Sequence, residues 1–172
     1  MIKDGCKYIE YKIKIDNSIS DTLSEKFNVQ KLPNEFVVSG INIENTKIEE
    51  FLNDSIWDEN YTITFYKDNK MLSYDNIITT GTIMRVYNKE KEFYQDYSMI
   101  LYGDVNGDGE INSFDALIVV NNKINGEKLY KNEINIEAGR TSEKTRNEKT
   151  IPSAVDALTI VKYKLGLDYI KQ

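Results

Sequence analysis

Alternating hydrophobic and polar residues mark the first hundred positions of the chain. Five segments show this alternation, or a run of β-branched and aromatic residues, and are predicted to be strands: 8–15, 36–43, 61–66, 82–87 and 93–101. Gly40 interrupts the second of them, and Asp68-Asn69 predicts a turn after the third. The capping-box pattern of Thr46 and Glu49 predicts a helix that begins at Thr46. This part is therefore expected to be a small β-rich α+β domain with one helix.

The spacing becomes helical after residue 102. Hydrophobic residues recur three or four positions apart in 113–125 and again in 154–165. The two segments are similar in sequence, and Asp115 and Asp156 occupy matching positions 41 residues apart (156 minus 115). We interpret them as an internal duplication, a loop followed by a helix in each half, with a short linking helix predicted at 128–137.

These patterns predict two domains. Residues 1–101 would form the β-rich α+β domain, in which the role of 1–35 stays open. Residues 102–172 would form an all-α domain built from two loop–helix repeats, each resembling half of an EF-hand.

Composition narrows the possible chemistry. The 172-residue chain has no histidine, which removes histidine triads and histidine metal ligands, and a single cysteine, Cys6, which excludes an internal disulfide and a thiolate cluster. Its net charge of -6 argues against a nucleic-acid partner and favours a hard cation or a basic protein surface. No apolar run approaches the roughly 18 residues of a membrane span, and residues 1–6 lack the apolar core of a secretory signal.

Little in the first domain suggests catalysis. Trp57 stands among Asp54, Asp58 and Glu59, a combination that could stack a sugar beside acids. A loop with a half-buried tryptophan is the simpler interpretation, so no catalytic residue is predicted.

The segment from Asp104 to Asp115 carries the clearest chemical signal. Oxygen-bearing residues stand at its positions 1, 3, 5, 7, 9 and 12: Asp104, Asn106, Asp108, Glu110, Asn112 and Asp115. This is the spacing with which an EF-hand loop surrounds a calcium ion, which takes about six to eight oxygen ligands. Gly109, at position 6, permits the sharp turn, and Ile111 should point into the core. We expect Glu110 to bind through its backbone carbonyl, Asn112 through a water, and the other four through their side chains.

Charge repulsion supports this prediction. Four carboxylates lie within twelve residues. A pair of like charges about 4 Å apart costs about 1 kcal/mol in water and nearer 4 kcal/mol at an effective dielectric constant of about 20. A divalent cation would remove that cost, whereas the alternative of a metal-free Gly/Asn/Asp turn would not.

The second loop has lost the metal pattern. Upstream of Asp156 the loop is longer than twelve residues and carries several basic residues: Arg140, Lys144, Arg146 and Lys149. Because they offer no lone pair and repel a cation, we expect this half to be metal-free. Ser153 and Asp156 are expected to cap the last helix, the alternative for Asp156 being a residual ligand role, and the charged run 142–149 is expected to be a solvated loop.

The C-terminal region resembles a type I dockerin domain. The likeness rests on Gly103–Leu117 and Ser153–Gly166, within a match of about 102–170. More loosely, residues 36–101 resemble a small α+β module that often precedes dockerins in secreted Firmicutes proteins, through Thr46–Leu52, Thr80-Gly81-Thr82 and the strand leading into Tyr102-Gly103-Asp104.

The resemblance implies a partner and a surface. Dockerins usually bind two calcium ions and attach their host protein to a cohesin domain of a scaffold, as in the polysaccharide-degrading cellulosome. The positions that meet the cohesin in the family correspond here to Ser113, Phe114, Val120 and Asn121 in the first half, and to Ser153, Ala154 and Lys162 in the second. Phe114 is either an exposed anchor for the partner or a contact with the preceding domain.

We therefore expect a non-catalytic, calcium-dependent docking module in an extracellular or cell-surface protein. Because residues 1–6 do not resemble a secretory signal, the chain is expected to be a fragment of a longer secreted protein or to have a misplaced start. Two alternatives stay open: a calcium-stabilised adhesion module without a cohesin partner, and a fragment of a carbohydrate-active enzyme.

Overall fold

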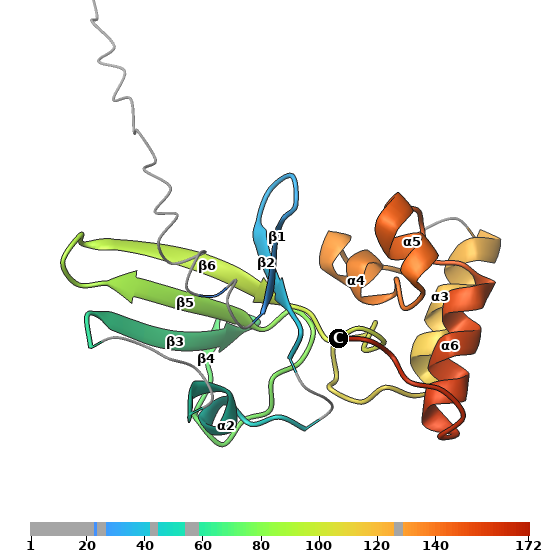
Figure 1. Ribbon diagram of the computed structural model, residues 1–172, viewed down its shortest axis with the longest axis horizontal. Helices are drawn as coiled ribbons and strands as arrows, with labels where there is room; N and C mark the ends of the chain where they lie inside the picture. Colours follow the sequence, from blue (N-terminus) through green and yellow to red (C-terminus); the bar gives the residue numbers. More distant parts are fainter. Residues whose placement is uncertain (1–22, 24–26, 42–44, 54–58, 126–128) are drawn as a thin grey trace, which may run out of the picture.

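The molecule combines one β-sheet with a group of helices. The computed structural model describes residues 23, 27–41, 45–53, 59–125 and 129–172. Within these ranges it contains a six-stranded sheet and five helices, so the predicted mixed α+β class is confirmed. Figure 1 shows the sheet and helix α2 at one end and helices α3 to α6 at the other. The strand predicted at 8–15 and the tryptophan loop at 54–58 lie outside the described residues.

The sheet has the order β1-β2-β6-β5-β3-β4. Its strands are β1 (Asn28–Lys31), β2 (Phe36–Ser39), β3 (Tyr61–Lys67), β4 (Lys70–Met71), β5 (Ile83–Asn88) and β6 (Phe93–Met99). Only the pairing of β2 with β6 is parallel among these strands. Asp68 and Asn69 both have positive φ, 49° and 62°, which suits the tight hairpin between β3 and β4. The turn predicted there is confirmed.

The predicted strands differ from the observed ones at their ends. β6 stops at Met99 rather than residue 101, and β2 stops at Ser39, before Gly40 with its φ of 90°. β1 and β4 were not predicted, because a strand of two to four residues is too short to show a clear alternation. Helix α2 (Ile48–Asn53) begins two residues later than predicted, and Glu50 rather than Glu49 accepts a hydrogen bond from the Lys47 amide, at 3.1 Å.

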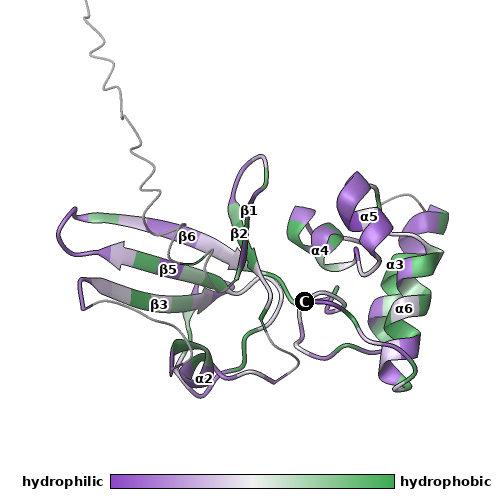
Figure 2. Ribbon diagram, viewed as in Figure 1, coloured by the Kyte–Doolittle hydropathy of each residue, from purple (hydrophilic) through white to green (hydrophobic). Residues whose placement is uncertain are grey.

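Four helices follow the sheet. They are α3 (Ser113–Asn125), α4 (Glu133–Ala138), α5 (Glu143–Glu148) and α6 (Ala154–Lys164). α3 and α6 match the two predicted repeats and lie side by side (Figure 1). α4 is shorter than the predicted linking helix. α5 corrects the expectation of a solvated loop at 142–149, because this charged segment forms a helix; Figure 2 shows that the helix is mainly hydrophilic.

Two hydrophobic cores meet at strand β2. One core lies between the sheet and α2 and includes Val38, whereas the other lies beneath α3, α4 and α6 and includes Val37. Successive residues of a strand point to opposite faces, so one short strand contributes to both. The second core also contains residues of the segment that leaves the sheet: Ile100, Leu101, Tyr102 and Val105. The acidic loop is therefore held at the junction of the two cores.

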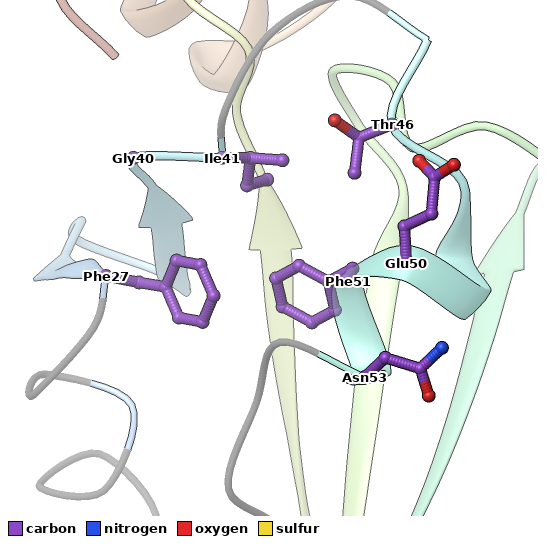
Figure 3. A pocket seen from close by; sticks show the side chains of 7 residues that line it. All are labelled: Phe27, Gly40, Ile41, Thr46, Glu50, Phe51 and Asn53. Carbon is purple, nitrogen blue, oxygen red and sulfur yellow. The ribbon is translucent and has the colours of Figure 1, made fainter.

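A shallow pocket lies between β2 and α2. Figure 3 shows its lining residues: Phe27, Gly40, Ile41, Thr46, Glu50, Phe51 and Asn53. The rings of Phe27 and Phe51 stack with their centroids 4.9 Å apart. Glu50 is the one ionisable side chain among the described lining residues, so the pocket lacks the pair of carboxylates that glycoside hydrolysis requires.

Candidate calcium site

The acidic loop connects the sheet to α3. Gly107 and Gly109 have φ angles of 78° and 91°, a conformation that L-amino acids with side chains rarely adopt. Ile111 is fully buried and belongs to the helical core, as predicted. The glycines therefore allow the chain to curl while Ile111 anchors its far side.

Asp104, at the first position of the loop, is fully buried. Its Oδ2 accepts a hydrogen bond from the Thr80 amide at 2.9 Å, whereas its Oδ1 has no hydrogen-bond partner in the described structure. Burial raises the pKa of this carboxyl, although the Thr80 and Gly109 amides and Lys67 act in the opposite direction. A buried carboxylate oxygen without a partner is unfavourable, and a cation would relieve it.

Asp115 connects the loop to α3. Its Oδ1 accepts the amides of Val105 and Asn106 at 2.8 and 3.0 Å, and its Oδ2 accepts the Asn112 amide at 3.0 Å. Burial raises the pKa of Asp115 to about 6, against the lowering effect of these amides. Because a carboxylate has about four acceptor sites, three amides leave room for one further ligand.

The four ligands predicted between these two aspartates form a series of short-range hydrogen bonds. Asn106 Oδ1 accepts the Asp108 amide at 2.9 Å, and Asp108 Oδ1 accepts the Glu110 amide at 2.9 Å. Asn112 Oδ1 accepts the Phe114 amide at 2.7 Å and so caps α3. Asp108 and Glu110 are exposed, and Asn106 and Asn112 are half-buried. The side-chain oxygens of Asn106, Asp108 and Asn112 are thus each held by an amide two residues further along the loop.

The residues fit a hard cation in kind, although they are not drawn together. In the part of the chain that the structure describes, no group of three or more Asp, Glu, Cys or His side chains gathers tightly enough to hold a metal ion. The unpartnered Asp104 Oδ1 and the oxygen-only donor set nevertheless suit calcium, which these six residues could hold as the sequence predicts.

A lysine from the sheet also reaches the loop. Lys67, the last residue of β3, donates hydrogen bonds from Nζ to the carbonyl oxygens of Gly107 at 2.5 Å and Thr80 at 3.0 Å, and to the Thr79 hydroxyl. Burial lowers the pKa of Lys67, whereas attraction to Asp104 and Asp108 acts against that shift. The sequence does not indicate this residue, because its contact Gly107 lies 40 positions away.

In the second repeat, an aspartate at the start of the helix again accepts hydrogen bonds from its own loop. Asp156, the counterpart of Asp115, accepts hydrogen bonds at Oδ1 from the Ser142 amide and the Thr145 hydroxyl, at 2.8 and 2.7 Å. Its Oδ2 accepts the amide and the hydroxyl of Ser153, both at 2.8 Å. The capping box predicted for α6 is therefore confirmed. Burial would raise the pKa of Asp156, but these hydrogen bonds outweigh it and lower the pKa.

The α3–α6 pair forms an exposed apolar groove. Its lining residues are Ser113, Ala116, Leu117, Val120, Ala154, Ala157, Leu158 and Val161. The structure thus places Ser113, Val120 and Ala154, three of the predicted partner residues, in one groove. Phe114 lies on the same helix and is 59% exposed, so it does not pack into the preceding domain.

The other predicted partner residues are less accessible or lie outside the groove. Asn121 and Ser153 are half-buried, and Lys162 is exposed on α6 but does not line the groove. The sequence does not indicate that Leu117, Leu158 and Val161 are surface residues. Their helical spacing suggests a buried face, yet Leu117 is 50% and Leu158 is 52% exposed.

An acidic, glycine-containing loop that opens a helix, with a related loop and helix after it, defines a protein of the EF-hand-like loop–helix class. Residues 102–150 match the family model described as the dockerin type I domain. This match is consistent with a dockerin domain in the C-terminal part of the chain. No curated protein and no solved structure matches the chain.

The general function of this family is known. Type I dockerins are calcium-binding, non-catalytic docking modules that bind cohesins, and they typically occur in extracellular components of cellulosomes. In the residues that the structure describes, no helix is both long and apolar enough to cross a membrane.

Proposed function

We propose that this chain is a calcium-dependent docking module that binds a cohesin and thereby anchors its host protein in a polysaccharide-degrading assembly outside the cell. The observation that carries this proposal is the exposed apolar α3–α6 groove directly beside the acidic loop. The module itself performs no catalysis.

The groove has the character of a protein interface. Leu117 and Leu158 are each about half exposed, and Phe114 is an accessible aromatic residue at the start of α3. Hydrophobic side chains left in water on two adjacent helices favour association with another surface. Aromatic residues are common anchors of such interfaces. Lys162 would contribute to the polar rim.

Calcium would position this surface. We propose a single ion in the first loop, held by Asp104, Asn106, Asp108, Glu110, Asn112 and Asp115, with the second half free of metal. Asp115 lies within the first turn of α3, so a cation bound by the loop restrains the end of the helix that carries Ser113 and Phe114. The ion would neutralise the loop and lower the cost of the buried Asp104 carboxylate.

The two halves of the face are not equivalent. The first half presents Ser113 and Phe114, whereas the second presents Ser153, whose hydroxyl caps α6, and Ala154. A cohesin would therefore meet different chemistry in the two possible orientations, and we propose that it binds in one. Residues 1–101 would form a companion domain and 102–172 the docking domain.

Binding to a panel of immobilised cohesins, measured in calcium and in EDTA, tests the proposal. We expect at least one cohesin to retain the chain in calcium and to release it in EDTA. Leu117→Glu and Leu158→Glu should each weaken that binding by about tenfold or more, because each places a charge in the apolar groove. Tyr74→Glu, at a 59% exposed residue outside the groove, is the matched control.

The result that would count against the proposal is equally specific. Failure of every cohesin to bind in calcium, with the chain folded by circular dichroism, would favour an adhesion module. If both leucine variants bound a cohesin as tightly as the wild type, the interface would have to lie outside the groove.

A further inference from the structure

We infer that the second repeat contains its own cation: the guanidinium of Arg146 takes the structural role that a metal ion would have in the second loop. This inference concerns the half for which we propose no calcium, and it does not require that a cohesin binds.

Arg146 lies against the residues that open the second loop. Its Nε donates a hydrogen bond to the Arg140 carbonyl at 2.6 Å, and its Nη2 donates to the Thr141 carbonyl at 3.4 Å. The guanidinium carbon lies 3.6 Å from the centroid of the Tyr102 ring. A cation that attracts backbone carbonyls of a loop and rests on an aromatic face restrains that loop much as an ion would.

The second loop begins as the first one does. In the first loop the amides of Val105 and Asn106 bond to Asp115, the third residue of α3. In the second loop the Ser142 amide bonds to Asp156, the third residue of α6. Arg146 therefore contacts the stretch that corresponds to the start of the calcium loop.

The loop openings are also in contact with each other. The Gly103 amide donates to the Ala138 carbonyl at 2.8 Å, just before each loop starts. Both loops are thus held at their first residues and at the helix that follows. The two loops differ in the residues between their first residues and the following helix. The first loop has acidic residues there, whereas the second has helix α5 with Arg146.

Two other bases of this segment, Arg140 and Lys149, pair with a buried carboxylate. The carboxylate of Glu137, whose side chain is 1% exposed, forms ion pairs with Arg140 and with Lys149, the latter at 3.0 Å. Its Oε1 also accepts the Tyr102 hydroxyl at 3.1 Å. Lys149 reaches Gln30 of β1 at 2.9 Å as well. The charges of residues 137–149 are therefore largely balanced within the protein.

The donor set of this loop does not fit calcium. Arg140 lies two residues before Ser142, whose amide bonds to Asp156, so it stands at the opening of the second loop and offers no side-chain oxygen. Thr145 and Ser142 donate to Asp156 or accept from neighbouring groups within the turn. A divalent ion would also meet the positive charge of Arg146 near the carbonyls it would need. The second loop is closed by its own side chains.

The consequence is an asymmetric response to calcium. Removal of calcium should loosen the first loop and the start of α3, whereas α6 and its part of the groove should stay folded. Hydrogen–deuterium exchange of the whole chain in calcium and in EDTA measures this directly. We expect amides of 104–118 to exchange about tenfold faster or more in EDTA, and those of 154–164 to change by less than about twofold.

Variants of Arg146 test the cation itself. In EDTA, Arg146→Met should speed exchange at 154–164 by about tenfold or more and lower the melting temperature by roughly 5–10 °C, because the Arg140 and Thr141 carbonyls and the Tyr102 ring lose the cation that they contact. Added calcium should stabilise both proteins through the first loop, but it should not remove the difference between Arg146→Met and the wild type in either quantity. Arg146→Lys should recover part of the loss. Lys144→Met, at an exposed lysine on the same helix, should behave as the wild type.

Distinct outcomes separate this inference from the proposed function. Loss of protection at 154–164 when wild-type protein is placed in EDTA would overturn the inference, and this arm stands even if Arg146→Met does not fold. An Arg146→Met protein as stable as Lys144→Met would also overturn it. A first loop that ignores EDTA would instead contradict the proposed calcium site and leave the role of Arg146 intact.

Discussion

A single side chain from the sheet, Lys67, supplies positive charge to the acidic loop. It bonds to the carbonyl of Gly107 in the loop and to Thr80 beside it, and it is attracted to Asp104 and Asp108. Thr80 in turn donates its amide to Asp104. These contacts stabilise the loop against the sheet, but the ammonium also repels any cation bound nearby.

Lys67→Met should therefore have two opposite effects. Without the ammonium, the loop loses a counter-charge, and the three hydrogen bonds that join Lys67 to Gly107, Thr79 and Thr80 are lost, so the melting temperature in EDTA should fall by about 3–6 °C. Calcium should then bind more tightly, by about fivefold, because a repulsion worth about 1 kcal/mol is removed. Calorimetric titration and thermal melts measure the two quantities.

The matched control for this change is Lys89→Met. Lys89 follows β5 at the opposite end of the β3–β5 pair and bonds to the Glu59 carbonyl. It should leave calcium affinity unchanged. If Lys67→Met and Lys89→Met bind calcium equally, the role of Lys67 is limited to its hydrogen bonds.

At the scale of the helices, α3 and α6 begin in the same way but differ in electrostatic environment. Each carries an aspartate at its third residue that accepts the amides of its own loop. Burial raises the pKa of Asp115 to about 6, whereas hydroxyl and amide donors lower the pKa of Asp156 despite its burial. The ionised form of Asp156 is thus already stabilised by the protein alone.

This difference predicts the acid stability of α6. Because the pKa of Asp156 is lowered in the folded state, its ionised form contributes stability above the ordinary value of 3.8, and that contribution is lost as the pH falls through the lowered pKa. Asp156→Asn should cost about 1–3 kcal/mol at pH 7, since an amide cannot accept all four hydrogen bonds. Its unfolding free energy should also fall less steeply than that of the wild type as the pH falls below about 4.

Denaturant titrations in EDTA at several pH values provide this measurement. Asp168→Asn, at an exposed aspartate beyond α6, serves as the control and should follow the wild-type curve. If the unfolding free energy of Asp156→Asn fell with pH in parallel with that of the wild type, the charge of Asp156 would not contribute to stability.

At the scale of the whole molecule, the sheet and the helical group are joined through the acidic loop. Gly107 approaches the Thr80 carbonyl so closely that a Cβ there would lie 2.7 Å from the oxygen. At Gly109 a Cβ would lie 2.8 Å from side-chain carbons of Ile77 and Thr79. The loop therefore packs backbone to backbone against the segment before β5, and a change at one side should be felt at the other.

Gly107→Ala tests this close packing. The substitution combines an unfavourable positive φ with a clash against Thr80, and should lower the melting temperature by roughly 5–10 °C. Gly81→Ala is a matched control, because its φ of 84° imposes similar strain while nothing lies within 4 Å of the new Cβ. If the melting temperatures of both variants fell equally, the contact between Gly107 and Thr80 would not restrain the loop against the sheet.

Short-range patterns in the sequence were enough for much of this protein. The three long strands, helices α3 and α6, the capping box of Ser153 and Asp156, and the inward position of Ile111 all follow from periodicity, capping and turn chemistry. The oxygen-rich spacing of the first loop is likewise local. Such features depend on residues within a few positions of one another, so the chain displays them directly.

Tertiary structure alone decided the rest. The inward roles of Lys67 and Arg146 depend on partners such as Gly107 and Tyr102, which lie 40 and 44 residues away in sequence (107 minus 67, 146 minus 102). The charges of 142–149 look solvated in sequence because periodicity cannot show that Glu137 is buried beside them. The exposed leucines of α3 and α6 look like core for the same reason. Burial and charge pairing arise from how distant elements meet, and no local pattern contains that information.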